Sequence, residues 1–283
     1  MTARCRTPRC VMLNVLRPCA NGTNPAPIAF ARALNIEADA RQEEVLRSPS
    51  KRTLLNCSRQ AGKSTVASVR ALHLAYFRPM SLALLISPSL RQSAELFRKI
   101  AQLVELLPTK ALLREDNKLS MRLENGSRIV SLTSSEATIR GFSGAHLIVE
   151  DESSRVPDDL YRPVRRMLAT SAGSLLLMST PFGKRGHFFE EWERGGDQWE
   201  RVCVPATACP RIAPSFLAEE RASLGEWWFR QEYLCEFVET VDQVFGFDIV
   251  SRAVTSEVKP LFARVTSPPS LPPAIQPLFG SLP

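Results

Sequence analysis

Apolar and polar positions follow two different periods along the chain, which predicts alternating strands and helices. Continuous apolar runs at residues 53–55, 81–87, 145–149 and 174–178 are short and end at polar or turn residues, as buried parallel strands do. A further strand is predicted at 199–204 and a further helix from Asp158. Helical spacing of apolar positions covers residues 27–34, 38–47, 64–72, 90–107, 214–224 and 226–237. This order of elements predicts an α/β fold with a mostly parallel sheet flanked by helices.

One stretch departs from that alternation. Residues 119–124 and 128–132 alternate apolar and polar positions on either side of Asn125-Gly126. An Asn-Gly pair between two alternating segments favours a tight hairpin turn. We therefore expect an antiparallel β-hairpin inserted into the α/β fold.

The two ends of the chain differ from its middle. Residues 1–26 show little periodicity, and residues 263–283 are rich in proline and contain no acid. We expect a disordered basic arm and a disordered tail around a folded domain at 27–237, with residues 238–262 as a linker that packs on this domain. The net charge is +7, but the first 35 residues contain five arginines and no acid. The remainder is nearly neutral, so contacts with a polyanion must come from local clusters.

Cysteine spacing and hydropathy exclude several protein classes. The seven cysteines include no C-x-x-C pair, so the sequence indicates neither a disulfide framework nor a zinc site. No apolar run approaches the roughly 18 residues that a membrane helix needs. We expect no membrane association and a cytoplasmic location.

Residues 54–65 join a predicted strand to a predicted helix through Gly62, Lys63 and Ser64. Gly-Lys-Ser at such a junction is typical of a phosphate-binding loop. The helix amides face an anion, the lysine reaches the β- and γ-phosphates, and the serine hydroxyl binds Mg²⁺. Cys57 stands where the usual motif has glycine. A polar strand-to-helix turn without a ligand is the alternative.

Three further features fit a nucleotide site. Gln42 precedes Lys63 by 21 residues, and its amide can read the adenine edge with a donor and an acceptor. A solvated helical glutamine is the alternative. The strand at 145–149 runs into Glu150, Asp151 and Glu152, at the sheet edge where ligands gather. These carboxylates could instead cap the next helix.

The strand at 174–178 leads into Ser179-Thr180-Pro181, which continues to Gly186. Thr180 at this position could sense a γ-phosphate. Pro-Phe-Gly, which follows from Pro181, is also ordinary turn chemistry, and that alternative stays open.

Taken in order, several of these segments resemble the ATPase domain of the large subunits of tailed-bacteriophage terminases, the motors that package DNA. The resemblance covers about residues 30–262. That family's phosphate loop itself lacks the first glycine and carries an arginine at the position of Arg59, so Cys57 supports the resemblance. The matching segments are residues 40–42, 56–65, 140–144, 147–159 and 179–186.

The resemblance implies a P-loop NTPase fold of the RecA or ASCE type and Mg²⁺-dependent ATP hydrolysis. It implies that Asp151, together with Ser64, is associated with Mg²⁺, and that Glu152 is the base that orients the attacking water. Lys63 and Arg59 would stabilise the transferred phosphoryl group. A shifted register with Glu150-Asp151 as the working pair stays open. The nucleotide-binding residues would be Gln42, Ser58, Arg59, Gln60, Ala61, Gly62, Lys63, Ser64 and Thr65, and the coupling motif Ser179, Thr180 and Pro181.

The partners that the resemblance implies are double-stranded DNA, a portal protein, a terminase small subunit and other copies of the chain in a ring on the procapsid, in the cytoplasm of a host bacterium. Such subunits usually continue into a nuclease domain. Here the sequence becomes proline-rich instead, so we expect no nuclease activity from this chain alone and consider a truncated prophage gene. Two alternatives are a superfamily-2 helicase or translocase fragment, and an inactive remnant that binds DNA or partners without turnover.

Overall fold

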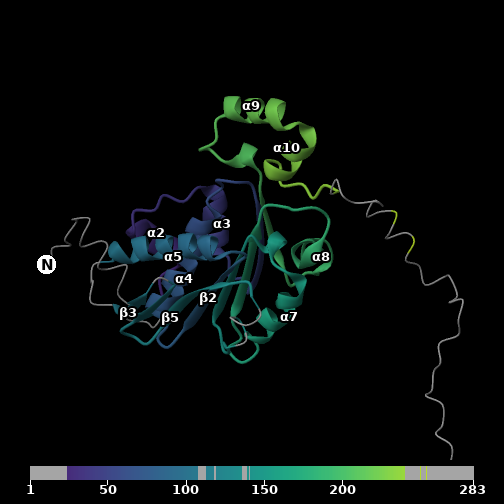
Figure 1. Ribbon diagram of the computed structural model, residues 1–283. Coiled ribbons are helices and arrows are strands. Elements are labelled where there is room, and N and C mark those ends of the chain that lie inside the picture. Colours follow the sequence, from purple (N-terminus) through teal and green to yellow (C-terminus); the bar gives the residue numbers. More distant parts are fainter. Residues whose placement is uncertain are drawn as a thin grey trace, which may run out of the picture. The chain divides into compact units, whose positions relative to one another are not determined.

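The computed structural model describes residues 24–107, 113–117, 119–135, 139, 141–239, 249 and 253, with the backbone alone at 113–117. These residues form an eight-stranded sheet in the order β3-β4-β5-β2-β6-β7-β1-β8 (Figure 1). All neighbours from β5 to β8 in that order pair in parallel. The predicted α/β fold with a mostly parallel sheet is confirmed. The strands are β1 (Arg52–Cys57), β2 (Leu82–Ser87), β3 (Leu113–Asn117), β4 (Ser120–Leu123), β5 (Arg128–Thr133), β6 (Leu147–Asp151), β7 (Ser174–Ser179) and β8 (Glu200–Val204).

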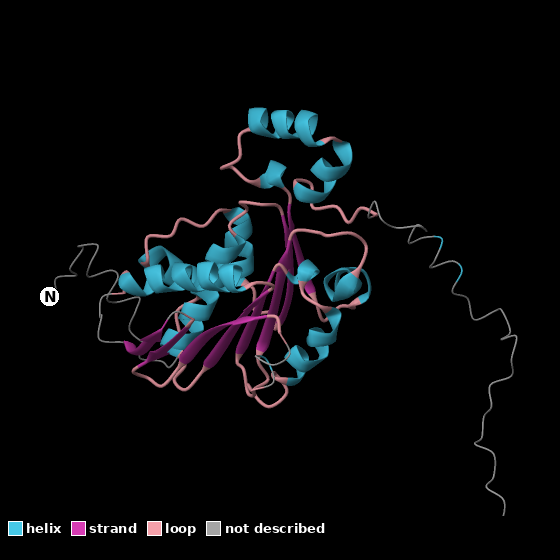
Figure 2. Cartoon of the chain, viewed as in Figure 1, coloured by secondary structure: helices cyan, strands magenta, loops and turns pink. Residues whose placement is uncertain are grey.

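Helices cover both faces of this sheet (Figure 2). One face carries α2 (Pro27–Ala33), α3 (Ala40–Arg47), α4 (Lys63–Phe77) and α5 (Leu90–Glu105). The other carries α7 (Asp158–Arg166) and α8 (Gly186–Arg194). Because successive side chains of a strand point to opposite faces, β6 contributes to both cores. Leu147 and Val149 lie in the core under α4 and α5, whereas Ile148 lies in the core under α7.

The predicted hairpin is present and belongs to the main sheet. β4 and β5 pair antiparallel, and the turn between them contains Gly126 at φ 81°. The amide of Asn125 donates to the carbonyl oxygen of Ala75 at 2.8 Å, which fixes the turn against α4. β5 also pairs in parallel with β2. The hairpin therefore extends the sheet, and the unpredicted β3 adds one further antiparallel strand beside β4.

One predicted helix is shorter than expected, and one helix was not predicted. The helix predicted at 226–237 is α10 (Glu226–Glu232) and ends five residues earlier. Cys235 adopts φ 61°, and its carbonyl oxygen accepts a hydrogen bond from the buried amide of Asn56 at 2.9 Å. This contact with β1 holds the chain in a non-helical path. Helix α8, which begins at Gly186 in the left-handed region at φ 80°, was not predicted from the sequence.

Several predictions fall on residues outside the described ranges. The arm at 1–26, apart from residues 24–26, and the tail at 263–283 lie outside them. Of the linker at 238–262, the structure describes Val238, Glu239, Ile249 and Ala253. Val238 is buried, and the indole of Trp227 donates to the carbonyl oxygen of Glu239 at 2.9 Å. The chain divides by contacts into Met1–Val241 and Asp242–Pro283. In the described part, no helix is long and apolar enough to cross a bilayer.

Candidate active site

The loop between β1 and α4 depends on Gly62 for its shape. Gly62 caps α4 in the left-handed region, with φ 86° and ψ 20°. Residues with a Cβ adopt this conformation at a cost. A Cβ on Gly62 would also lie 2.0 Å from the Nε2 atom of Gln42. Glycine therefore allows α3 and the loop to approach each other. At the start of α4, the backbone N–H groups of Thr65 and Val66 donate to the carbonyl oxygen of Gly62 at 3.0 and 3.3 Å, and those of Lys63 and Ser64 have no acceptor within the helix.

Gln42 is not a solvated helical residue. It is buried, with 7% of its surface exposed. Its Oε1 atom accepts from the backbone N–H of Asp39 at 3.0 Å, and its Nε2 atom donates to the carbonyl oxygen of Ala61 at 3.4 Å. Each end of the amide keeps one further hydrogen-bonding position. The structure places Gln42 beside the phosphate loop.

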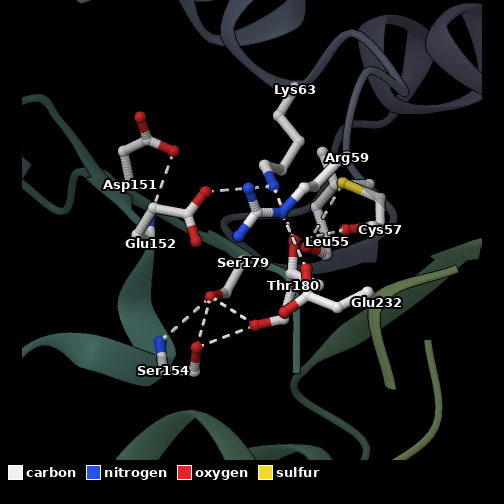
Figure 3. Close-up of polar contacts among 10 residues, drawn as sticks. All are labelled: Leu55, Cys57, Arg59, Lys63, Asp151, Glu152, Ser154, Ser179, Thr180 and Glu232. Carbon is white, nitrogen blue, oxygen red and sulfur yellow. Dashed lines mark hydrogen bonds and ion pairs between the residues drawn. The ribbon is translucent and has the colours of Figure 1, made fainter. Parts of the chain in front are cut away.

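Lys63 lies where the loop meets the carboxyl ends of β6 and β7 (Figure 3). Its Nζ atom is 3.2 Å from Oε1 of Glu152 and donates to Oγ1 of Thr180 at 3.1 Å. The hydroxyl of Thr180 donates in turn to the carbonyl oxygen of Cys57 at 3.2 Å. Burial opposes the charge of Lys63, but Cys57, Glu152 and Asp151 outweigh it and raise the pKa of Lys63 above its ordinary value.

The alternation of β6 separates the two acids at its end. Asp151 belongs to the face that packs under α4, and burial together with the charge of Glu152 raises its pKa to about 6. Glu150 lies on the other face, fully buried, with its Oε1 atom 2.5 Å from Nε2 of His187 on α8. Glu152 follows the strand in the left-handed region, at φ 51°. Asp151 and Glu152 are thus on the side of Lys63, and Glu150 is not.

The alternative that these acids cap the following helix is wrong. The N-cap of α7 is Pro157, and no side chain caps this helix. Instead, the backbone after Glu152 forms the short 3₁₀ helix η2 (Ser153–Arg155).

The predicted coupling segment contacts η2 directly. The hydroxyl of Ser154 lies 2.6 Å from that of Ser179 and donates to the carbonyl oxygen of Thr180 at 2.8 Å. The backbone N–H of Ser154 also donates to Oγ of Ser179 at 3.2 Å (Figure 3). Pro181 is buried, directly after these contacts. The end of β7 and the segment after Glu152 therefore share a hydrogen-bond network.

Two open cavities, of about 530 and 500 Å³, adjoin the loop. Gln60, Lys63 and Ser64 line both of them. The first also includes Gln42, Gly62, Thr65 and Arg211, and the second includes Arg59, Glu152, Arg155, Thr180 and Glu232. Ser58, predicted to bind nucleotide, is fully buried and lines neither cavity. Ala61, also buried, lines neither and turns its carbonyl oxygen to Gln42.

Arg59 lies in the loop, as predicted, but it pairs with an acid that the sequence did not indicate. Its Nε atom donates to Oε2 of Glu232 on α10 at 2.7 Å. The side chain of Arg59 is 68% exposed, that of Glu232 only 11%. The guanidinium is therefore anchored at one end and open to the cavity.

A sequence model of one family matches residues 54–252 of this chain, which is most of its length. The family is described as terminase large subunit, T4likevirus-type, N-terminal. The chain belongs to this family. The terminase large subunit of Thermus phage G20c is 27% identical over 246 residues, covering 74% of this chain and 50% of that protein. The subunit of Thermus virus P23-45 matches to the same extent. The chain thus spans about half the length of the curated terminase relatives it matches.

Solved terminase structures share the fold. The large terminase ATPase domain of Thermus phage P74-26 gives a TM-score of 0.67 at 22% identity, over 78% of this chain and 99% of that one. The large terminase of bacteriophage HK97 gives 0.60 at 17% identity, over 83% and 55%. The large terminase of another thermophilic bacteriophage, solved in complex with ADP, gives 0.61 at 10% identity, over 71% and 54%.

Sequence reasoning missed three residues of this candidate site. Arg211 forms an ion pair with Asp39 at 2.9 Å and donates to the carbonyl oxygen of Ala61 at 3.3 Å. Glu232 contacts Arg59, and Ser154 contacts the predicted coupling segment, as described above. All three come from segments with no phosphate-loop signature. The Ser-Ser-Arg run after Glu152 gave no specific signal either, because the bonds of Ser154 to Ser179 and Thr180 join segments 25 and 26 residues apart.

Proposed function

We propose that this chain binds ATP with Mg²⁺ and hydrolyses the bond between its β- and γ-phosphates to give ADP and phosphate, as the motor that moves double-stranded DNA into a procapsid. The observation that carries this proposal is the position of Lys63, which contacts Glu152 and Thr180 at the edge where the phosphate loop meets β6 and β7. Membership of the terminase family supports the DNA-packaging role over a superfamily-2 helicase fragment.

The nucleotide is proposed to lie across both cavities, with its base beside Gln42 and its phosphates over Lys63. Gln42 retains a free donor and a free acceptor for the adenine edge. The first-turn amides of α4 and the ammonium of Lys63 would cradle the phosphates. Arg211 borders the base cavity and contributes a cation that the family motif did not indicate. Ser58 has no proposed contact with nucleotide.

The oxygen donors at this edge suit Mg²⁺. The hydroxyl of Ser64 and the carboxylate of Asp151 are hard ligands of the kind that this ion takes alongside phosphates and water. When bound, Mg²⁺ would neutralise charge on the phosphate oxygens. Asp151 has a carboxyl group on the α4 side of the sheet, and its pKa of about 6 leaves it largely ionised at neutral pH. The donor set therefore fits the ion.

Glu152 is proposed as the base that orients water for in-line attack. Its carboxylate lies 3.2 Å from the Lys63 ammonium, on the side of the loop where we place the γ-phosphate. It would accept the proton of the attacking water while Lys63 stabilises the developing charge. For Arg59 to assist, its guanidinium must exchange the Glu232 carboxylate for phosphate oxygens. Its planar fork suits either partner.

The structural change caused by hydrolysis would be transmitted through Ser179, Thr180 and Pro181. Thr180 touches Lys63, and Ser179 touches Ser154, so a change at the γ-phosphate would shift the end of β7 and η2 together. We propose double-stranded DNA, a portal protein, a small subunit and a homo-oligomeric ring as the partners, in the cytoplasm of a host bacterium.

Steady-state hydrolysis tests this proposal. The wild-type chain should release phosphate from ATP when Mg²⁺ is present. Glu152→Gln should bind ATP with similar affinity and turn it over at least a hundredfold more slowly, because an amide cannot accept the proton. Binding without turnover by the wild-type chain would support the inactive-remnant alternative instead.

A further inference from the structure

Behind the candidate active site, a buried histidine joins β6, α7 and α8. The His187 side chain is 5% exposed. Its Nε2 atom lies 2.5 Å from Oε1 of Glu150, and its Nδ1 atom lies 3.1 Å from Oδ1 of Asp158. The same Asp158 oxygen accepts the backbone N–H of His187 at 2.6 Å. The ring of Tyr161 stacks on the imidazole, with centroids 4.6 Å apart.

The geometry of this cluster favours a doubly protonated ring. Carboxylates face both nitrogens, and both nitrogens are donors only in the imidazolium form. Burial alone would lower the pKa of His187, but the charge and hydrogen bond of Glu150, with those of Asp158, raise it above its ordinary value. The imidazolium also compensates the charge of Glu150, which is fully buried and would be costly unpaired.

The cluster reaches the proposed base through Ser153. The hydroxyl of Ser153 donates to Oε1 of Glu150 at 2.5 Å and lies 3.0 Å from Nε2 of His187. Oε2 of Glu150 has no hydrogen-bond partner among the described residues, so Oε1 carries both contacts. Ser153 directly follows Glu152, whose left-handed backbone persists only where its surroundings hold it.

The same histidine also follows the coupling segment in sequence. His187 is the second residue of α8, which begins at Gly186, five residues after Pro181 at the end of the predicted coupling motif. The turn at Glu152 is therefore held from two directions. Ser154 bonds the end of β7, and Ser153 bonds Glu150 and His187. A displacement of α8 cannot leave Ser153 unaffected while the Glu150 contact persists.

We propose that His187 is a positioning residue for hydrolysis, which clamps Glu150 and Ser153 to α8 and thereby holds the Glu152 turn in register with the coupling segment. This inference rests on the proposed hydrolysis and extends it to the opposite face of the sheet. Glu150 then has a role distinct from metal binding, as the buried anchor of the clamp.

The test compares His187→Gln and Glu150→Gln with the wild-type full chain. At position 187, glutamine is uncharged and cannot donate hydrogen bonds to both Glu150 and Asp158 as the imidazolium does. Each single variant should lower kcat at least about tenfold, as displacement of a catalytic group does, while KM and ATP affinity change less than about twofold. The double variant should be no slower than the slower single one, because both changes break one contact. Losses in kcat that multiply in the double variant would contradict the clamp.

Phe189→Leu provides the matched control on the same helix. The ring of Phe189 is buried and packs against that of Phe237, with centroids 5.1 Å apart. Two residues along a helix point in nearly opposite directions, so this change loosens α8 on the side away from the His187 imidazole. This variant should be less stable but should retain kcat. If it loses as much kcat as His187→Gln, the effect is general destabilisation and the inference is wrong.

Amide hydrogen exchange gives a readout that does not depend on turnover. The backbone N–H groups of Glu152 and Ser154 are both hydrogen-bonded, to Asp151 and Ser179. Peptides that contain them should exchange faster in His187→Gln than in the wild type, and not in Phe189→Leu. If the wild type proves inactive while this difference is seen, the proposed function fails and the clamp stands. If exchange is unchanged, the clamp itself is refuted.

Discussion

Replacement of Gly62 by alanine should disrupt both the phosphate loop and the capping of α3. The backbone at φ 86° costs alanine about 1–2 kcal/mol. The new methyl group would lie 2.0 Å from Nε2 of Gln42, so the amide must move by more than 1 Å to reach ordinary contact. That movement breaks the bond from Asp39, worth about 0.5–1.5 kcal/mol. We therefore expect a loss of about 1.5–3.5 kcal/mol in the free energy of unfolding.

Urea denaturation of Gly196→Ala, of Gln42→Ala and of the double variant Gly62→Ala/Gln42→Ala separates the two causes. Gly196 has φ 74° and no atom within 4 Å of the position that a methyl group would take, so Gly196→Ala should show only the backbone cost of about 1–2 kcal/mol. In the double variant with Gln42→Ala, the clash is absent, so the two losses should be less than additive. Full additivity, or a loss for Gly62→Ala no larger than for Gly196→Ala, would refute the close approach of Gln42 and Gly62.

Three other outcomes are expected. Arg59→Ala should lower kcat more than it raises KM, and Arg59→Lys should restore little, because lysine lacks the planar fork; steady-state kinetics would contradict this if only KM rose. Asp151→Asn should weaken the Mg²⁺ dependence of ATP binding, measured by titration with and without the ion, whereas Glu150→Gln should leave that dependence intact; the reverse result would favour the shifted register. The pKa of His187 is raised, so its contribution to stability is present below its ordinary pKa of 6.5 and is lost as the pH rises through its folded value. The difference in unfolding free energy between wild type and His187→Gln should therefore shrink as the pH rises above 6.5, and a difference that grew with pH would show the opposite shift.

The central strands and the phosphate loop could be predicted from the sequence because their signals are local. A short apolar run followed by Gly62-Lys63-Ser64 specifies strand, turn and helix within a dozen residues. The acids at the end of β6 were found in the same way. Their register stayed open, because it depends on which face each side chain occupies, and that follows from where the strand packs.

The rest of the site depends on contacts between distant segments. Glu232 reaches Arg59 from 173 residues away, and Arg211 reaches Ala61 from 150. The early end of α10 has the same origin, because Cys235 is held by a buried amide on β1 and not by any local breaker. The role of His187 could not be predicted, because a lone histidine before two phenylalanines is equally compatible with simple packing in an apolar core.

Calorimetric titration of ATP with Mg²⁺ into the wild-type chain and into Lys63→Ala tests the central claim most directly. Lys63 is the buried cation of the loop, at 10% side-chain exposure, and a bound triphosphate would lose its main charged partner. The account predicts saturable binding to the wild-type chain and none measurable to Lys63→Ala under the same conditions, with the folded state of the variant verified by its thermal unfolding. Equal affinity of the two proteins for ATP would contradict the assignment of this loop as the nucleotide site.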